Sequence, residues 1–256
     1  MRIIRVEHGG TSYYGILEDG LVFRLHQQPG HMEPIPLSEA KVLPLVTPSK
    51  VVCVGLNYKA HAEELGYPLP NMPSFFLKPP SSIIGNGEPI VLPSGMGRIE
   101  HEAELAMVVG KVCRNLTPEE AEESLFGFTC ANDVTAREVQ KVDPLIGHCK
   151  SYDTFCPIGP WIETELEDIN DLSIRCLVNG EVRQSANTGD MIFRPLDLLC
   201  FLSRVMTLMP GDVILTGTPP GISPIQADDV VQVSIEGIGT LSNPVEGPCP
   251  EEKILQ

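Results

Sequence analysis

The sequence predicts a β-rich α+β protein with a small strand-rich unit at its N-terminus. Its 256 residues include 23 Gly and 24 Pro, and this content favours turns over long helices. Short apolar runs recur along the chain, whereas helical periodicity is confined to a few short segments. Asp-Gly at 19–20 and Asn-Gly at 179–180 separate such runs, as is typical of β-hairpin turns.

Residues 1–48 are predicted to form the small N-terminal domain, and residues 49–256 the main domain. Short apolar runs divided by Gly-Gly and Asp-Gly predict strands in the first unit, at 2–6, 12–17 and 21–25. The polar stretch 27–36 contains three Pro and is expected to be a loop or linker between the two domains.

The main domain is predicted to hold many strands and few helices. Its expected strands lie at 51–54, 75–78, 89–92, 102–109, 126–131, 213–216, 230–235 and 239–244, with a hairpin at 173–184. Two Thr-x-x-Glu capping boxes, at 117–120 and 135–138, predict the starts of short helices. Helical spacing also predicts a short helix within 57–66 and a longer one within 194–208.

Composition limits the classes of partner and the cellular location. The net charge of −16 disfavours binding to nucleic acid or anionic lipid. The eight Cys form no C-x-x-C pair and often lie in apolar runs, so buried reduced thiols are expected rather than a zinc or redox motif. No signal peptide and no apolar run of about 20 residues is evident, so a cytoplasmic protein is expected.

Glu102 and Glu104 are the first candidates for chemistry. On a strand they share one face, while Ala103 and Leu105 face the other side. They could form a solvated strand face. However, the apolar run that follows favours a strand buried on both sides, and buried paired carboxylates need a cation.

Asp133 could complete a metal site with the two glutamates. It directly follows an expected strand, where it could instead cap the next helix. Three carboxylates without His or Cys would suit Mg²⁺ or Mn²⁺ rather than zinc.

Three further residues each allow two interpretations. His61 and Glu64 are spaced i, i+3 on an expected helical turn, so they could form a surface ion pair or a general base with its orienting carboxylate. Lys150 fits no periodic pattern and could be a solvated surface lysine or a group that stabilises an enolate.

A set of motifs in fixed order resembles the fumarylacetoacetate hydrolase family, from about residue 51 to 245. They are VGLNY at 54–58 with His61 and Glu64, FLKP at 76–79, EAEL at 102–105, NDVTAR at 132–137 with Gln140, KSYDTF at 150–155, VNG at 178–180 and LTGTP at 215–219. The first 45 residues resemble the small N-terminal domain of some bacterial members. His101 and Glu138 depart from the usual pattern, where an aromatic residue and Asp are common.

The resemblance implies a mixed β-sandwich roll, a homodimer and a small 2-oxo acid as substrate. It implies Mg²⁺ or Mn²⁺ as a cofactor on Glu102, Glu104 and Asp133, with Lys150 polarising a substrate oxygen. Its other implied substrate-binding residues are Arg137, Gln140 and Thr218.

The implied activity is a metal-dependent hydrolase that cleaves a carbon–carbon bond in an acylpyruvate-type 2,4-dioxo acid through a metal-stabilised enolate. The same site could instead serve a tautomerase, an isomerase or a decarboxylating lyase, acting on oxaloacetate or a 2-hydroxyhepta-2,4-diene-1,7-dioate type substrate. A third alternative is an acidic binding protein with a degenerate site.

His61 and Glu64 match a dyad that hydrolytic and decarboxylating members carry on a mobile lid. The polar segment 57–66 is followed by a Pro-rich stretch, so it has little apolar surface to hold it down. We expect it to be mobile without ligand and to close over a bound 2-oxo acid.

Overall fold

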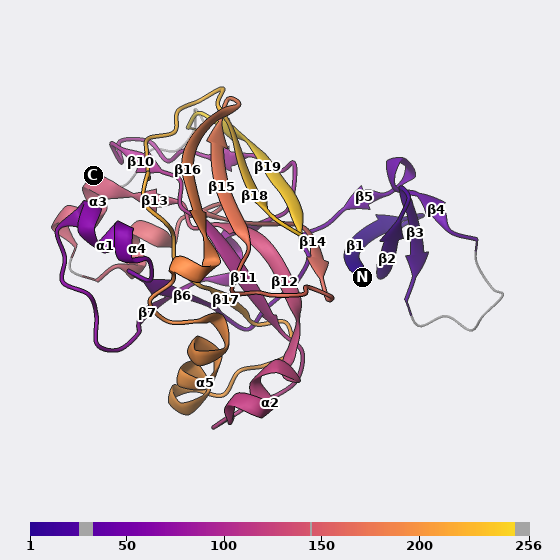
Figure 1. Ribbon diagram of the computed structural model, residues 1–256. Coiled ribbons are helices and arrows are strands. Elements are labelled where there is room, and N and C mark those ends of the chain that lie inside the picture. The colour runs from indigo at the N-terminus through magenta and orange to yellow at the C-terminus, as the bar shows by residue number, and fades with distance from the viewer. Residues whose placement is uncertain (26–32, 144, 249–256) are drawn as a thin grey trace.

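A computed structural model describes residues 1–25, 33–143 and 145–248 of the chain. Figure 1 shows a β-rich main body with a small group of strands, β1 to β5, standing to one side. Helices are few and short, as predicted, and the longest in the described residues is α5 (Pro195–Val205).

The largest sheet runs through both parts of the chain. Its path is β4-β3-β2-β1-β14-β12-β11-β17-β6-β7, with β5 paired to β1 and β8 to β14. The bounds are β1 (Arg2–His8), β2 (Thr11–Glu18), β3 (Leu21–Arg24), β4 (Ile35–Pro36), β5 (Lys41–Val42), β6 (Val51–Gly55), β7 (Ser74–Lys78), β8 (Ile83–Ile84), β11 (Ala103–Val109), β12 (Leu125–Asn132), β14 (Cys156–Glu163) and β17 (Val213–Leu215).

A second, five-stranded sheet covers one face of the first. Its order is β16-β15-β18-β19-β9, with bounds β15 (Ser173–Val178), β16 (Glu181–Asn187), β18 (Val230–Ile235), β19 (Gly239–Glu246) and β9 (Ile90–Val91). A two-stranded ladder pairs β10 (Ile99–Glu100) with β13 (Thr135–Ala136). The remaining helices are α1 (Lys59–Leu65), α2 (Pro118–Glu122), α3 (Arg137–Val142) and α4 (Gly147–Lys150), with 3₁₀ turns at Leu37–Glu39, Pro80–Ser82 and Thr188–Asp190.

The core explains why β11 is apolar on both faces. Leu105 and Met107 belong to a cluster that also takes side chains from β15, β18 and α5. Ala106 and Val108 point the other way, into a second cluster that includes Ile3 of the N-terminal strands. The strand is therefore a central layer with no solvated face, and any charged side chain at its start is carried into the interior.

Most elements expected from the sequence are present. Both hairpin turns have positive φ at their two central residues, 48° and 77° at Asp19-Gly20 and 53° and 80° at Asn179-Gly180, as a type I′ turn requires. Thr117 and Glu120 form the expected capping box of α2. The seven described cysteines are all free and buried. No described helix is long and apolar enough to cross a bilayer.

Two expectations change. The capping box at 135–138 is wrong, because Thr135 lies in β13 and its hydroxyl contacts the Glu102 carboxylate at 3.1 Å, while α3 starts at Arg137 without a side-chain cap. The loop expected at 27–36 lies partly outside the described residues, which omit 26–32, and its end forms β4. The division into domains at residues 48 and 49 stays a prediction, while the β1–β14 pairing makes the large sheet continuous across it.

Candidate active site and metal centre

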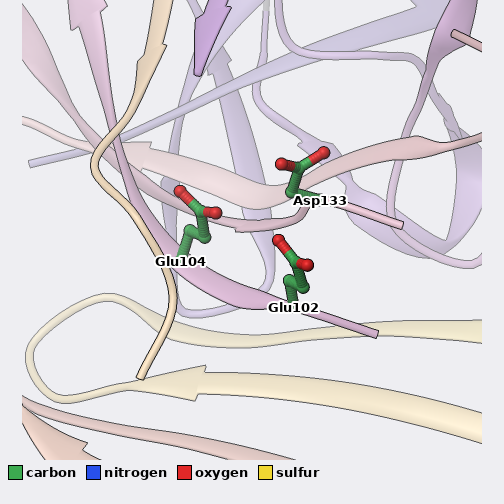
Figure 2. Close-up of side chains that lie close together, drawn as sticks. All are labelled: Glu102, Glu104 and Asp133. Atoms are coloured by element: carbon green, nitrogen blue, oxygen red, sulfur yellow. The ribbon is translucent and has the colours of Figure 1, made fainter. Parts of the chain in front are cut away.

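Glu102, Glu104 and Asp133 meet at the paired ends of β11 and β12. The antiparallel register sets Ala103 opposite Asn132, so Asp133 emerges beside Glu102, and its N–H donates to the Glu102 carbonyl at 2.8 Å. Figure 2 shows the side chains of Glu102 and Glu104 pointing toward Asp133, which directly follows β12. One carboxylate oxygen from each residue lies within 4.8 Å of the others. The structure therefore brings together the three predicted ligands.

All three carboxylates are buried, with exposed fractions of 6%, 1% and 1% for Glu102, Glu104 and Asp133. The solvated-face interpretation of Glu102 and Glu104 is wrong, because the sheet is covered on both sides. The helix-cap interpretation of Asp133 is also wrong, since α3 begins only at Arg137.

Buried cations balance two of these carboxylates. Lys150 Nζ donates to Glu102 at 2.8 Å and to Asp133 at 2.7 Å. Lys78 Nζ donates to the other oxygen of Asp133 at 2.5 Å, and Arg137 pairs with Glu102. Lys150 is only 3% exposed, so the surface-lysine interpretation is wrong.

The pKa values of the two glutamates shift in opposite directions. Burial alone would raise the pKa of Glu102, but the charges of Lys150 and Arg137 outweigh it and lower that pKa below its usual range. Burial raises the pKa of Glu104 well above its usual value, and the negative charges of Asp133 and Glu102 add to this effect. Glu104 accepts the Gly217 N–H at 2.5 Å, but no lysine or arginine among the described residues pairs with it.

This donor set fits a hard divalent cation. Three buried carboxylates converge with no His or Cys ligand beside them, and oxygen ligands of this kind suit Mg²⁺ or Mn²⁺. A cation would also supply the positive charge that Glu104 lacks. Glu102, Glu104 and Asp133 are therefore the residues that would hold it.

The raised pKa of Glu104 predicts that metal binding strengthens as pH rises. At a pH below that raised pKa the carboxyl keeps its proton, so Mn²⁺ must displace the proton in order to bind. We expect affinity to increase through the Glu104 titration and then to level off above it.

Calorimetry in buffers of different ionisation enthalpy should show release of about one proton per bound Mn²⁺ on the acidic side of this titration. Glu104→Gln cannot lose this proton and should show no such release. Proton uptake, or a pH-independent affinity of the unsubstituted protein, would contradict the assignment.

His61 and Glu64 lie on α1 as the spacing predicted. His61 Nδ1 lies 2.8 Å from Glu64 Oε2; His61 is 5% exposed, whereas the Glu64 side chain is 35% exposed, so the pair has one buried and one exposed partner. Glu64 Oε1 accepts the Gly221 N–H at 3.0 Å, which ties the helix to the loop after β17. Because a carboxylate only accepts, Nδ1 carries the ring proton when His61 is neutral, which leaves Nε2 able to accept one.

One cleft of about 680 Å³ is lined by every predicted site residue except Glu64. Arg137 Nε donates to Glu100 at 2.5 Å and its NH1 donates to Gln140 at 2.8 Å. Two nitrogens of this guanidinium are therefore already bonded to residues of the site. The Thr218 hydroxyl donates to the Ala103 carbonyl at 2.9 Å. The substrate-binding roles of Arg137, Gln140 and Thr218 stay predictions.

Sequence reasoning missed three buried residues around this cleft. Lys78, Glu100 and Gln184 are each 1% exposed and hydrogen-bonded to site residues. Lys78 lies in the FLKP motif but had no role assigned to it. A charged residue at the end of an apolar strand was the one signal that could have revealed it.

A family model described as the C-terminal domain of fumarylacetoacetate (FAA) hydrolase matches residues 50–246. The chain belongs to the fumarylacetoacetate hydrolase family. A second model, described as the N-terminal domain of Rv2993c-like proteins, matches residues 1–44.

Solved structures of family members share the whole fold. A 5-carboxymethyl-2-hydroxymuconate delta-isomerase from Mycobacterium smegmatis is 42% identical, with a TM-score of 0.90 over 97% of this chain and 100% of that one. A maleylpyruvate hydrolase from Sphingobium sp. SYK-6, in complex with manganese(II) and pyruvate, is 30% identical, with a TM-score of 0.82 over 97% and 100% of the chains. The predicted family fold is confirmed.

A human relative adds a third named activity. The mitochondrial oxaloacetate tautomerase FAHD2A is 42% identical over 225 residues, which are 82% of this chain and 71% of the relative. Family members similar to this chain thus include a hydrolase, an isomerase and a tautomerase. The prediction of a family enzyme on a hydrolase or isomerase scaffold is confirmed.

Proposed function

We propose that this protein is a divalent-metal-dependent hydrolase that cleaves a carbon–carbon bond in an acylpyruvate-type 2,4-dioxo acid. The observation that carries the proposal is the His61–Glu64 dyad, which lies on α1 with the ring of His61 lining the carboxylate cleft. Hydrolysis needs a base to activate water, and this dyad supplies one.

Glu64 orients His61 by accepting a hydrogen bond from Nδ1–H, and the Gly221 N–H donates to the other oxygen of Glu64. Nε2 then takes a proton from a water molecule as that water attacks the distal carbonyl carbon of the substrate. The bond between this carbon and the neighbouring methylene carbon breaks, and its electron pair passes into the enolate of the 2-oxo acid fragment. The proton held on Nε2 then returns to the former methylene carbon of the enolate, which completes the reaction.

Lys150 provides a fixed positive charge for the enolate oxygen. Burial would lower its pKa, but the charges of Asp133 and Glu102 outweigh this effect and raise it, so the ammonium stays protonated. It therefore acts as a charge and hydrogen-bond donor rather than as a base. A cation on Glu102, Glu104 and Asp133 would supply further positive charge beside the 2-oxo acid oxygens.

Turnover of a panel of acylpyruvates with Mg²⁺ or Mn²⁺ tests the proposal. The expected result is cleavage of at least one member to a carboxylic acid and a 2-oxo acid in equal amounts. Failure to cleave any member at high enzyme concentration, with metal binding demonstrated in the same preparation, would refute hydrolysis.

A second candidate uses the same site without an activated water, as a tautomerase, an isomerase or a decarboxylating lyase. The names of the Mycobacterium smegmatis isomerase and the human tautomerase favour it. Oxaloacetate and a 2-hydroxyhepta-2,4-diene-1,7-dioate type acid are the substrates to test. Conversion of either without hydrolysis of any acylpyruvate would select this candidate.

We also propose that the cation is Mg²⁺ or Mn²⁺, that the protein is a homodimer and that it is cytoplasmic. Free buried thiols at all seven described cysteines support a reducing compartment. The net charge of −16 supports a small-molecule partner rather than nucleic acid or an anionic membrane.

We also propose that α1 is a lid that closes over a bound 2-oxo acid. Asn57 is fully buried, and its side chain bonds to Phe193 and Thr216 at 2.7–2.9 Å, so the moving part would begin after it. Hydrogen exchange on the Mn²⁺-loaded protein should show slower exchange at amides 58–66 when oxalate is added. Equal protection with and without oxalate would mean that α1 is preformed over the site.

A further inference from the structure

Gln184 is a buried amide that joins the two sheets beside the cleft. It lies on β16 of the five-stranded sheet and is 1% exposed. Its Oε1 accepts the Ala103 N–H at 3.0 Å, between Glu102 and Glu104. Its Nε2 lies 2.8 Å from Thr218 Oγ1 and 2.7 Å from the Pro219 carbonyl oxygen.

The orientation of this amide is fixed by its backbone partners. A backbone N–H can only donate and a carbonyl can only accept, so Oε1 must face Ala103 and Nε2 must face Pro219. His101 Nδ1 lies 3.0 Å from the same Oε1 and must therefore donate to it. His101 Nε2, 2.8 Å from Ser223 Oγ, then accepts the Ser223 hydroxyl proton when the ring is neutral.

These contacts gather on residues 218–223, which we call the strap. Thr218 is at its start, and Gly221 in its middle donates to Glu64 at 3.0 Å. Gly221 has φ of +97°, and a Cβ there would stand 2.2 Å from the Arg183 carbonyl oxygen, so the strap lies directly against β16. Ser223 at its end is held by His101.

We propose that Gln184 is the positioning residue that seats the strap, and so sets the orientation of both Thr218 and the Glu64 acceptor. Because the Thr218 hydroxyl proton goes to the Ala103 carbonyl and one lone pair goes to Gln184, its rotation is fixed from two sides. The inference rests on the proposed function through the substrate role of Thr218.

Replacing Gln184 with Met keeps the length of the side chain but removes all four hydrogen bonds. The Pro219 carbonyl, the Ala103 N–H and His101 Nδ1 would then have to find new partners, and the strap could leave β16. β11 itself would stay in place, because it remains paired with β12 and β17. The substitution should therefore displace the strap more than it displaces the metal ligands.

A double-mutant cycle tests this without turnover. Oxalate binding to the Mn²⁺-loaded protein is measured by calorimetry for the unsubstituted chain, Gln184→Met, Thr218→Val and the double variant. We expect Gln184→Met alone to weaken oxalate binding about tenfold, and to weaken it less than about twofold in the Thr218→Val background. Mn²⁺ affinity should stay within about threefold, since the pairing of β11 with β12 and β17 keeps the ligands in place.

Asn243→Leu is the matched control. Asn243 is also a buried amide, 2% exposed, and it donates to the Gly85 and Glu88 carbonyls at 2.8 Å in a loop outside the cleft. The Asn243→Leu variant should be less stable than the unsubstituted protein but should bind oxalate with the same affinity. Unchanged oxalate affinity in Gln184→Met, additive effects in the cycle, or a larger loss of Mn²⁺ than of oxalate affinity would each overturn the proposal.

A second measurement needs no substitution at Gln184. Nitrogen chemical shifts of labelled histidine in the unsubstituted protein should show that Nδ1 of His101 carries a proton. The tautomer protonated on Nε2 would overturn the network, even where Gln184→Met does not fold. Neither measurement requires acylpyruvate cleavage, so a failure of the hydrolase proposal is distinguishable from a failure of this one.

Discussion

Replacing Lys150 with Met is expected to abolish most turnover and to destabilise the protein before a cation binds. The variant loses the positive charge proposed to face the enolate oxygen, and loss of one such donor typically costs about 10²–10³ in kcat. It also leaves Glu102 and Asp133, both buried, with only Arg137 and Lys78 as charged partners. Breaking a buried ion pair in this way costs about 3–5 kcal/mol.

Denaturant unfolding with and without Mn²⁺ separates the two effects of Lys150→Met. Added Mn²⁺ should recover much of the lost stability, because a cation on the same carboxylates replaces the missing charge, whereas turnover should stay low. Lys111→Met is the matched control, since Lys111 is 52% exposed and pairs with the exposed Glu123; its stability should change by less than about 1 kcal/mol. Normal turnover in Lys150→Met would remove Lys150 from the mechanism.

Replacing His61 with Ala is expected to reduce acylpyruvate hydrolysis by about 10²–10⁴, the usual contribution of a positioned base. His61 is not among the three carboxylate ligands, so the affinities for Mn²⁺ and oxalate should stay close to those of the unsubstituted protein. Stopped-flow turnover and calorimetry on the same preparation measure both quantities.

The His61→Ala variant also discriminates between the two candidate functions. Tautomerisation of oxaloacetate needs no activated water and could survive if another group moves the proton. His8→Ala, at the end of β1, is the control for loss of an imidazole away from the cleft. Hydrolysis that persists unchanged in His61→Ala would show that the dyad is not the base.

Local signals in the sequence made the three metal ligands candidates, and the family resemblance implied them as a set. Glu104 lies in β11 and Glu102 directly precedes that strand, and the alternation of an extended segment puts both side chains on the same side. Asp133 directly follows β12, which pairs with β11, and antiparallel pairing of consecutive strands is the simplest way to connect them. The i, i+3 spacing of His61 and Glu64 was likewise enough to predict their contact.

Local sequence could not decide which interpretation of each residue was right. Lys150 has no periodic pattern, and its burial follows from α4 being packed against β7 and β13. Thr135 looked like a helix cap because its spacing to Glu138 is that of a capping box. In the structure, the pairing of β10 with β13 draws Thr135 into a strand and its hydroxyl to Glu102.

The sequence by itself determined the β-rich class and the hairpin turns, which depend on residue type and short spacing, and its ordered set of motifs indicated the family and the three carboxylates. Only the tertiary structure decided the charge balance of the site, because Lys78, Lys150 and Arg137 approach the carboxylates from separate elements. It also decided the place of Gln184, which reaches Ala103 across 81 residues of chain. Such contacts follow from how two sheets pack, and no spacing along one strand or helix encodes that packing.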